Sequence, residues 1–244
     1  MLKPLATLLA AASAVSLAAP VWAQGASVAP TASAATTLDP TAEDALQALL
    51  AEPEPPDAFG YPATQVDAAV PDPRWASLQA HASAAPPPGE WGQLTLALKG
   101  RPLRTMAETV NSFVNRHVAL AADRDVWGVD DYWADLEETI EAGRGDCEDF
   151  AIAKMRLMEA AGAPSRDLYL LLVGDLGRGV DHAVLLVRDG ADLLMLDSTS
   201  DRVLPIGQVT RYRPIMAFSG SARWLFRPDL VDVAAQDDLL SQPH

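Results

Sequence analysis

Three apolar runs of strand length follow one another in the second half of the chain, and they constrain its fold more than any other feature. The runs are DLYLLLVGDL, GVDHAVLLVRDG and DLLMLDSTS, and Gly or Asp residues bound each of them. Apolar stretches of this length between turn residues are typical of buried β-strands. The stretch RYRPIMAFSGSARWLF, near the C-terminus, is predicted to add another strand. Together these runs predict an antiparallel sheet.

Helical patterns precede the predicted sheet. In TMAETVNSFVNRHVAL, residues 105–120, apolar residues recur at helical spacing. The stretch DCEDFAIAKMRLMEAAG, residues 146–162, has acids in its first turn and Gly162 as a stop, so it predicts a strong helix. Between them, DVWGVDDYWADLEETIEAG predicts a loop and a short helix that ends near Gly143. Helices followed by an antiparallel sheet form an α+β layout, with helix 146–162 packed on the sheet.

The N-terminal part of the chain predicts an export signal followed by a flexible leader. Residues 1–23 contain one Lys, an apolar run and small residues at the end, which is typical of a secretory signal peptide cut after Ala23. Residues 24–89 are rich in Ala, Pro, Thr and Ser and predict a flexible leader, interrupted by one short helical stretch, AEDALQALLAE. Order is expected to begin near Trp91, in a single domain over residues 90–244. After removal of the signal, no membrane insertion is expected.

Acidic residues outnumber basic ones, and many of them lie in one part of the chain. The formal net charge is -15, which argues against binding of nucleic acid or anionic lipid because both need a basic surface. Between Asp123 and Asp149 there are eleven Asp or Glu residues and only two basic ones. Such a run is either a solvated face or a site for a cation.

The chain has one cysteine, Cys147, at the start of the helix predicted over residues 146–162. A lone thiol in an exported chain cannot form an internal disulfide, so it is either a packed core residue or a group kept for its reactivity. The amino end of a helix favours a thiolate, but the neighbouring Asp146 and Glu148 oppose one. A calcium ion would neutralise these acids, because calcium takes several oxygen ligands in irregular geometry. The alternative, that both are ordinary first-turn helix acids, stays open.

A nucleophilic cysteine needs an imidazole to take its proton, so the histidines are the next candidates. His81 lies in the predicted leader and His244 is the last residue. His117 lies on a predicted helix and reads better as a surface or capping residue. His182 differs from these because it stands near the start of an apolar strand.

The third member of a triad has to orient the imidazole. Asp197 ends the apolar run that follows the strand of His182. A buried Asp must be paired, and a His on the neighbouring strand would pair it. Cys147, His182 and Asp197 are therefore the predicted catalytic residues. The alternative is that His182 and Asp197 only mark the ends of strands.

Four blocks of the sequence resemble a known family. They are D-x-W-x-x-D-D-Y-W, G-D-C-E-D-F-A-I-A-K, D-H-A-V-L-L and L-M-L-D-S, and they lie between Trp91 and Phe226. The chain is similar there to the bacterial transglutaminase-like cysteine proteinases, in particular to their LapG-type periplasmic members. The resemblance implies a papain-like, transglutaminase-related fold. It also implies a Cys-His-Asp triad at the positions of Cys147, His182 and Asp197.

The resemblance further implies a requirement for calcium, bound by the acids that flank the cysteine. Those acids correspond to Asp146 and Glu148, and Asp131 of the D-D-Y-W block is a weaker candidate ligand. Ala183 stands where the family pattern has Met, and Ser198 stands where it has Asn. Neither change removes a side chain of the triad.

Members of the LapG type act in the periplasm on a large surface adhesin. They cut its N-terminal region at a small-residue site rich in Ala, which releases the adhesin and disperses the biofilm. An inner-membrane receptor for cyclic di-GMP sequesters the protease through its periplasmic domain. The resemblance implies these partners for this chain. Two other functions stay open, a transglutaminase-like acyltransferase or amidase with the same triad, and a non-catalytic calcium-binding docking module.

Overall fold

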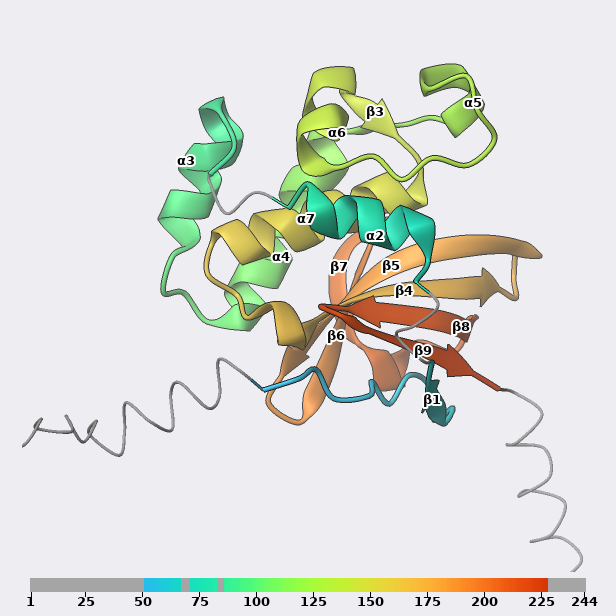
Figure 1. Cartoon of the computed structure of the whole chain (residues 1–244). Helices are drawn as coiled ribbons and strands as arrows, with labels where there is room; N and C mark the ends of the chain where they lie inside the picture. The colour runs from blue at the N-terminus through green and yellow to red at the C-terminus, as the bar shows by residue number, and fades with distance from the viewer. Residues whose placement is uncertain (1–50, 67–70, 83–85, 228–244) are drawn as a thin grey trace, which may run out of the picture.

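A computed structural model describes residues 51–66, 71–82 and 86–227, and within them one antiparallel sheet of seven strands carries the fold (Figure 1). The strand order is β1-β9-β8-β4-β5-β6-β7, and every neighbouring pair is antiparallel. The strands are β1 (Ala63–Gln65), β4 (Leu168–Asp175), β5 (Val180–Asp189), β6 (Asp192–Asp197), β7 (Ser200–Pro205), β8 (Tyr212–Ser219) and β9 (Ala222–Phe226).

The three apolar runs form β4, β5 and β6, so the predicted antiparallel sheet is confirmed. The C-terminal run forms two strands rather than one, because the chain turns at Gly220 between β8 and β9. Side chains of β4 and β5 are buried on both faces of the sheet, which explains why these runs are apolar almost without interruption.

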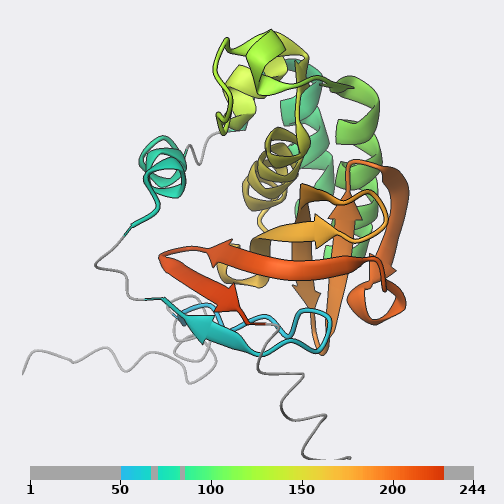
Figure 2. The same ribbon diagram turned by 90° about the vertical axis from the view of Figure 1, so that its right-hand side faces the viewer.

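Helices cover one face of the sheet (Figures 1 and 2). Among them, α7 is central, since it packs on β5 and β4 and also against α4 and α6. Its residues from Asp149 to Met158 are all buried. The helices are α2 (Pro73–Ala80), α3 (Gly89–Leu98), α4 (Leu103–His117), α5 (Asp123–Val126), α6 (Leu136–Ala142) and α7 (Cys147–Ala160). Two short parallel strands, β2 (Ala119–Leu120) and β3 (Arg144–Gly145), and two 3-10 turns, at Ser165–Asp167 and Ile206–Gln208, complete the described elements.

Packed residues lie on both sides of the predicted domain boundary at residue 90. The strand β1 pairs with β9 at the sheet edge, and the stretch before it contacts the sheet face opposite the helices (Figure 2). Trp75 and Leu78 of α2 are buried in the core, and Arg156 of α7 donates a hydrogen bond to the Leu78 carbonyl at 2.9 Å. Residues 51–66 and helix α2 lie within the segment predicted to be a flexible leader. They are packed instead, because their apolar side chains are buried against the sheet and in the helical core.

Other predictions for the N-terminal part concern residues outside the described ranges. The signal peptide and most of the stretch AEDALQALLAE lie there. None of the described helices is long and apolar enough to span a bilayer.

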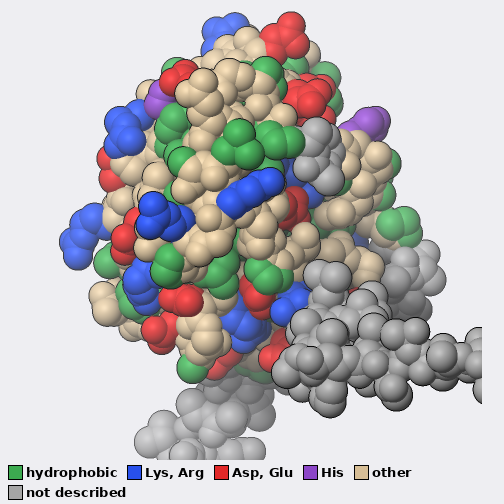
Figure 3. Space-filling view, turned by 90° about the vertical axis from the view of Figure 1, so that its left-hand side faces the viewer, with side chains coloured by type: hydrophobic (Ala, Val, Ile, Leu, Met, Phe, Trp, Pro, Cys, Tyr) green, Lys and Arg blue, Asp and Glu red, His purple; other side chains and the backbone are tan. Residues whose placement is uncertain are grey.

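On the face drawn in Figure 3, acidic and basic side chains of the described residues are interspersed with apolar ones.

Candidate active site

The only cysteine stands at the first position of α7. Asp146 is the N-cap of this helix, and its side chain accepts a hydrogen bond from the Glu148 backbone at 3.2 Å. Asp149 completes a capping box, because its carboxylate accepts from the Asp146 backbone at 3.2 Å. A side chain at Gly145 would meet the Asp149 carboxylate at 2.4 Å, so the turn into the helix requires glycine there.

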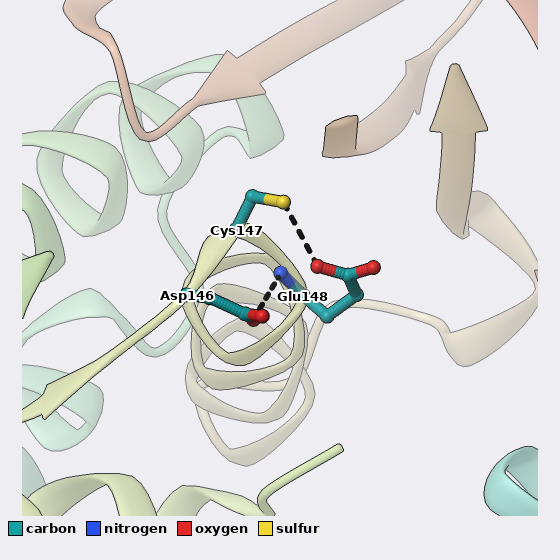
Figure 4. Close-up of side chains that lie close together, drawn as sticks. All are labelled: Asp146, Cys147 and Glu148. Atoms are coloured by element: carbon teal, nitrogen blue, oxygen red, sulfur yellow. Dashed lines mark hydrogen bonds between the residues drawn. The ribbon is translucent and has the colours of Figure 1, made fainter. Parts of the chain in front are cut away.

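The thiol of Cys147 is half-buried and faces an acid. Its sulfur donates a hydrogen bond to Glu148 Oε2 at 2.8 Å (Figure 4). Burial raises the pKa of the Cys147 thiol above its ordinary value, and the charges of Glu148 and Asp146 raise it further. A hydrogen bond from the Ala183 backbone acts in the opposite direction. In this arrangement the thiol is held in its protonated form.

His182 and Asp197 form a buried pair at the ends of neighbouring strands. His182 lies near the start of β5 and Asp197 is the last residue of β6. The imidazole Nε2 lies 3.0 Å from Asp197 Oδ1, and the two side chains are 8% and 4% exposed. Because Nε2 is engaged with the carboxylate, Nδ1 is the ring nitrogen that remains for a thiol proton.

Several donors converge on the Asp197 carboxylate. The Tyr212 hydroxyl donates to Oδ2 at 2.6 Å, while the Thr199 backbone and hydroxyl donate to Oδ1 at 2.8 and 2.9 Å. Burial alone would raise the pKa of Asp197, but the hydrogen bonds from His182, Tyr212 and Thr199 outweigh it and hold this pKa well below its usual range. Asp197 is therefore an anion that accepts from His182.

One cavity brings the predicted residues from the helix and the sheet together. It has a volume of about 530 Å³, and both Cys147 and His182 line it. Its apolar rim includes Leu120, which is 75% exposed, and Val180, which is 55% exposed. The small side chains Ala121 and Ala122 line the same cavity. An extended peptide with small side chains could reach the thiol along this wall.

Acidic side chains crowd the start of α7 from several elements. Burial, together with the charges of Glu148, Asp149 and Asp123, raises the pKa of Asp146 to about 8. Burial also raises the pKa of Asp149 to about 7, against hydrogen bonds from the Ala134 and Asp146 backbones. Carboxyl groups with pKa values this high hold protons at neutral pH unless a cation compensates their charge.

Two groups of these side chains have the spacing of a cation site. Asp146, Cys147 and Glu148 form one, and Asp123, Asp146 and Asp149 form the other, with the atoms of each group within 4.8 Å of one another. The structure therefore brings the predicted ligands Asp146 and Glu148 together. Calcium suits this set, because the carboxylate oxygens are hard ligands and their arrangement is irregular.

Asp123 was missed as a candidate by the sequence reasoning. It is buried, and its Oδ2 accepts a hydrogen bond from the Tyr132 backbone at 2.6 Å. Its other oxygen, Oδ1, is buried and has no hydrogen-bond partner among the described residues, so it is available as a ligand. The only signal in the sequence was that Asp123 begins the acidic run, and its closeness to Asp146 depends on the tertiary fold.

Asp131, the weaker predicted ligand, lies outside both groups. Its carboxylate accepts a hydrogen bond from Arg74 of α2 at 2.6 Å, and its side chain is 54% exposed. The structure thus ties Asp131 to α2 and places Asp123 with Asp146 and Asp149.

The described histidines other than His182 do not line the cavity. His81 is exposed, and its Nδ1 lies 2.8 Å from the Ser77 carbonyl. His117 stacks on Phe113 at the end of α4. These positions agree with the preference for His182.

Comparisons with known proteins point to one family. The sequence model of the family described as bacterial transglutaminase-like cysteine proteinase matches residues 90–225. Calcium-bound LapG from Legionella pneumophila is 31% identical with a TM-score of 0.52, and the match covers 62% of this chain and 86% of that one. A further Legionella pneumophila LapG structure has the same identity and TM-score and covers 67% and 94%. No curated protein sequence matches the chain.

Proposed function

The chain belongs to the bacterial transglutaminase-like cysteine proteinases, and we propose that within this family it is a calcium-dependent periplasmic endopeptidase that cleaves a large surface adhesin. One observation carries the proposal. The cysteine at a helix start and the histidine of a buried His-Asp pair line the same cavity. This is the arrangement that nucleophilic catalysis by a thiol requires.

The mechanism follows from the atoms that face the cavity. His182 takes the thiol proton at Nδ1, and the Cys147 sulfur attacks the carbonyl carbon of the scissile bond. Asp197 accepts a hydrogen bond from Nε2–H and holds the imidazole in this tautomer. The Cys147 backbone N–H at the start of α7 would donate to the oxyanion. The imidazolium then gives its proton to the leaving amine as the C–N bond breaks, and water hydrolyses the thioester with His182 again as base.

The acids at the start of α7 fit calcium. Asp146, Glu148 and the open Oδ1 of Asp123 would hold the ion, with Asp149 beside them and Asp131 kept as a weaker candidate. When bound, calcium supplies the positive charge that compensates these carboxylates and removes their opposition to a thiolate. The calcium-bound LapG structure supports this assignment by similarity.

The substrate and its regulation are proposed from the similarity to LapG and from the cavity. The wall of Ala121, Ala122 and Leu120 suits an Ala-rich segment of an adhesin N-terminal region. Cleavage would release the adhesin and promote biofilm dispersal, under the control of an inner-membrane cyclic di-GMP receptor. Residues 1–23 have the composition of a signal peptide, which supports a periplasmic location.

The test is cleavage of Ala-rich adhesin N-terminal fragments by wild type and Cys147→Ala, each with calcium and with a chelator. We expect cleavage only by wild type with calcium. If the chelator left cleavage unchanged, the proposed role of calcium would be contradicted, and the proposed Cys-His-Asp triad would be unaffected. Without cleavage under any condition, incorporation of an amine into the fragments would indicate an acyltransferase instead. Absence of both reactions would favour a docking module.

A further inference from the structure

The His182–Asp197 pair lies beyond the point where backbone pairing holds its two strands together. The pairing of β5 with β6 runs from Asp189 and Asp192 to Leu185 and Leu196 and ends there. His182 lies three residues before this end on β5, and Asp197 lies one residue after it on β6. The position of the Asp197 carboxylate next to the imidazole therefore depends on side-chain contacts.

An arginine from a third part of the sheet contacts this carboxylate. Arg211 directly precedes β8, and one terminal nitrogen of its guanidinium, Nη2, lies 3.4 Å from Asp197 Oδ2. The same nitrogen donates to the Thr199 hydroxyl at 3.0 Å and to the Tyr212 hydroxyl. It also lies 3.8 Å from the Asp175 carboxylate. Asp175 ends β4 and Asp197 ends β6, so the guanidinium contacts both strands that flank β5 in the sheet order.

The arginine also determines the direction of two hydrogen bonds to Asp197. A guanidinium can only donate, so the hydroxyls of Thr199 and Tyr212 accept from Arg211. Their own protons are then directed to the Asp197 carboxylate, to which they donate at 2.9 and 2.6 Å. Arg211, the two hydroxyls, Asp197 and His182 thus form one network, in which each hydrogen bond strengthens the next.

We propose that Arg211 is a positioning residue of the catalytic reaction, which orients the donors around the Asp197 carboxylate. The carboxylate held in this way keeps the proton of the His182 imidazole on Nε2 and leaves Nδ1 for the thiol proton. Arg211 does not line the cavity of Cys147, so its effect reaches the thiol only through His182. This inference rests on the proposed function, because that function assigns His182 and Asp197 their roles.

A purely structural role makes a different prediction. The Arg211 side chain is 44% exposed, and ion pairs of exposed side chains contribute little to stability. Asp175 would keep Arg178, at 3.9 Å, and the hydrogen bonds from two backbone N–H groups to its Oδ1 after the loss of Arg211. We therefore expect the loss of Arg211 to change the reaction far more than the melting temperature.

The experiment compares Arg211→Met with wild type in the full chain. Arg104→Met is the matched control, because Arg104 is 40% exposed and pairs with two carboxylates, those of Asp189 and Asp192, at the other end of β5 and β6. We expect kcat for fragment cleavage to fall between about tenfold and about a hundredfold in Arg211→Met, with KM unchanged. The control keeps the wild-type kcat, and both variants keep a melting temperature close to that of wild type.

A second measurement does not depend on proteolysis. The ¹⁵N NMR signals of the His182 ring, recorded in a Cys147→Ala background at a pH where the ring is neutral, report which ring nitrogen carries the proton. We expect the proton on Nε2 alone when Arg211 is present, and on both nitrogens in turn after Arg211→Met. A folded Arg211→Met protein with unchanged ring signals would overturn the proposal, whatever happens to kcat.

Two further outcomes are distinguished by the same measurements. If Arg211→Met did not fold, Arg211→Lys would take its place, because it keeps the charge on a shorter stem. Wild-type kcat and wild-type ring signals in that variant would overturn the proposal. A wild type that cleaves no fragment would contradict the proposed function, and the ring signals of His182 would still decide the positioning role.

Discussion

On the imidazole side of the candidate active site, His182 and Asp197, several donors contact the Asp197 carboxylate, whereas on the thiol side Cys147 lies among acids that raise its pKa. Donors from four residues, His182, Thr199, Tyr212 and Arg211, contact the Asp197 carboxylate, and hydrogen bonds from the first three hold its pKa low. At the start of α7, buried acids raise one another's pKa values and that of the thiol.

The difference shows which half depends on a partner from outside the chain. The imidazole side is assembled from residues of the chain alone, because both oxygens of the Asp197 carboxylate meet donors. The helix start carries several carboxyl groups around one thiol, and their charges raise the pKa of Asp146 and of the thiol. A cation is the simplest compensation for this charge. Under the proposed function, calcium would therefore control activity through the thiol side.

The largest effect is expected from breaking the imidazole side with Asp197→Asn. The amide keeps the shape but cannot hold His182 in the tautomer that accepts a proton at Nδ1, so kcat should fall about 10³- to 10⁴-fold. The measurement is fragment cleavage with calcium present. Asp192→Asn, at the exposed other end of β6, is the control and should stay near wild type. Equal activity of the two variants would remove Asp197 from the triad.

The next effect tests which acids complete the thiol side. Asp123→Asn removes one charge from the group with Asp146 and Asp149, so calcium affinity should fall by about tenfold or more. Asp131→Asn should change it little, because that carboxylate is tied to Arg74. Titration calorimetry on chelator-treated protein measures both. If Asp131→Asn lowered the calcium affinity more than Asp123→Asn does, Asp131 would be the ligand, as predicted from sequence, and Asp123 would not.

A third prediction concerns how the stability of the calcium-free protein depends on pH. The folded pKa values of Asp146 and Asp149, about 8 and about 7, lie above the ordinary value of 3.8. Between pH 5 and 7 the folded state therefore binds more protons than the unfolded state, and the free energy of unfolding falls as the pH rises. Urea unfolding of chelator-treated protein at several pH values measures this slope.

Calcium and Asp146→Asn are the controls for that slope. Saturating calcium should flatten it, because the ionised carboxylates are then compensated in the folded state. Without calcium, Asp146→Asn should reduce the slope to the part that Asp149 contributes. A slope of the opposite sign in the chelated wild type would mean that the acids at the start of α7 are not held protonated in the folded chain.

Much of the fold and of the candidate active site could be predicted from sequence. The contacts that could not be predicted have a common physical reason. The apolar runs of β4, β5 and β6 predicted the antiparallel sheet, and the family match confirms the transglutaminase-like fold. Local patterns also pointed to the helix start at Cys147 and to the strands that carry His182 and Asp197. Only tertiary packing brings Asp123 to Asp146 and ties Asp131 to Arg74.

Packing also explains what was missed in the leader and the core. Trp75 and Leu78 lie in an Ala- and Pro-rich stretch, whose composition predicted a flexible leader. Both side chains are nevertheless buried in the core. Lys154 lies in the middle of α7, and the helical pattern did not indicate that this lysine is fully buried. Contacts between elements far apart in sequence are the common cause.

The smallest effect is expected from Tyr212→Phe, which removes one of the hydrogen bonds to Asp197. Because His182 and Thr199 still contact the carboxylate, we expect kcat/KM to fall only about five- to tenfold, which corresponds to about 1 kcal/mol. Tyr169→Phe is the matched control, since its hydroxyl donates to the Glu54 carbonyl, away from the cavity. It should lower stability and leave kcat/KM unchanged. If Tyr212→Phe were fully active, the donors that remain on the Asp197 carboxylate, from His182, Thr199 and Arg211, would be sufficient for catalysis.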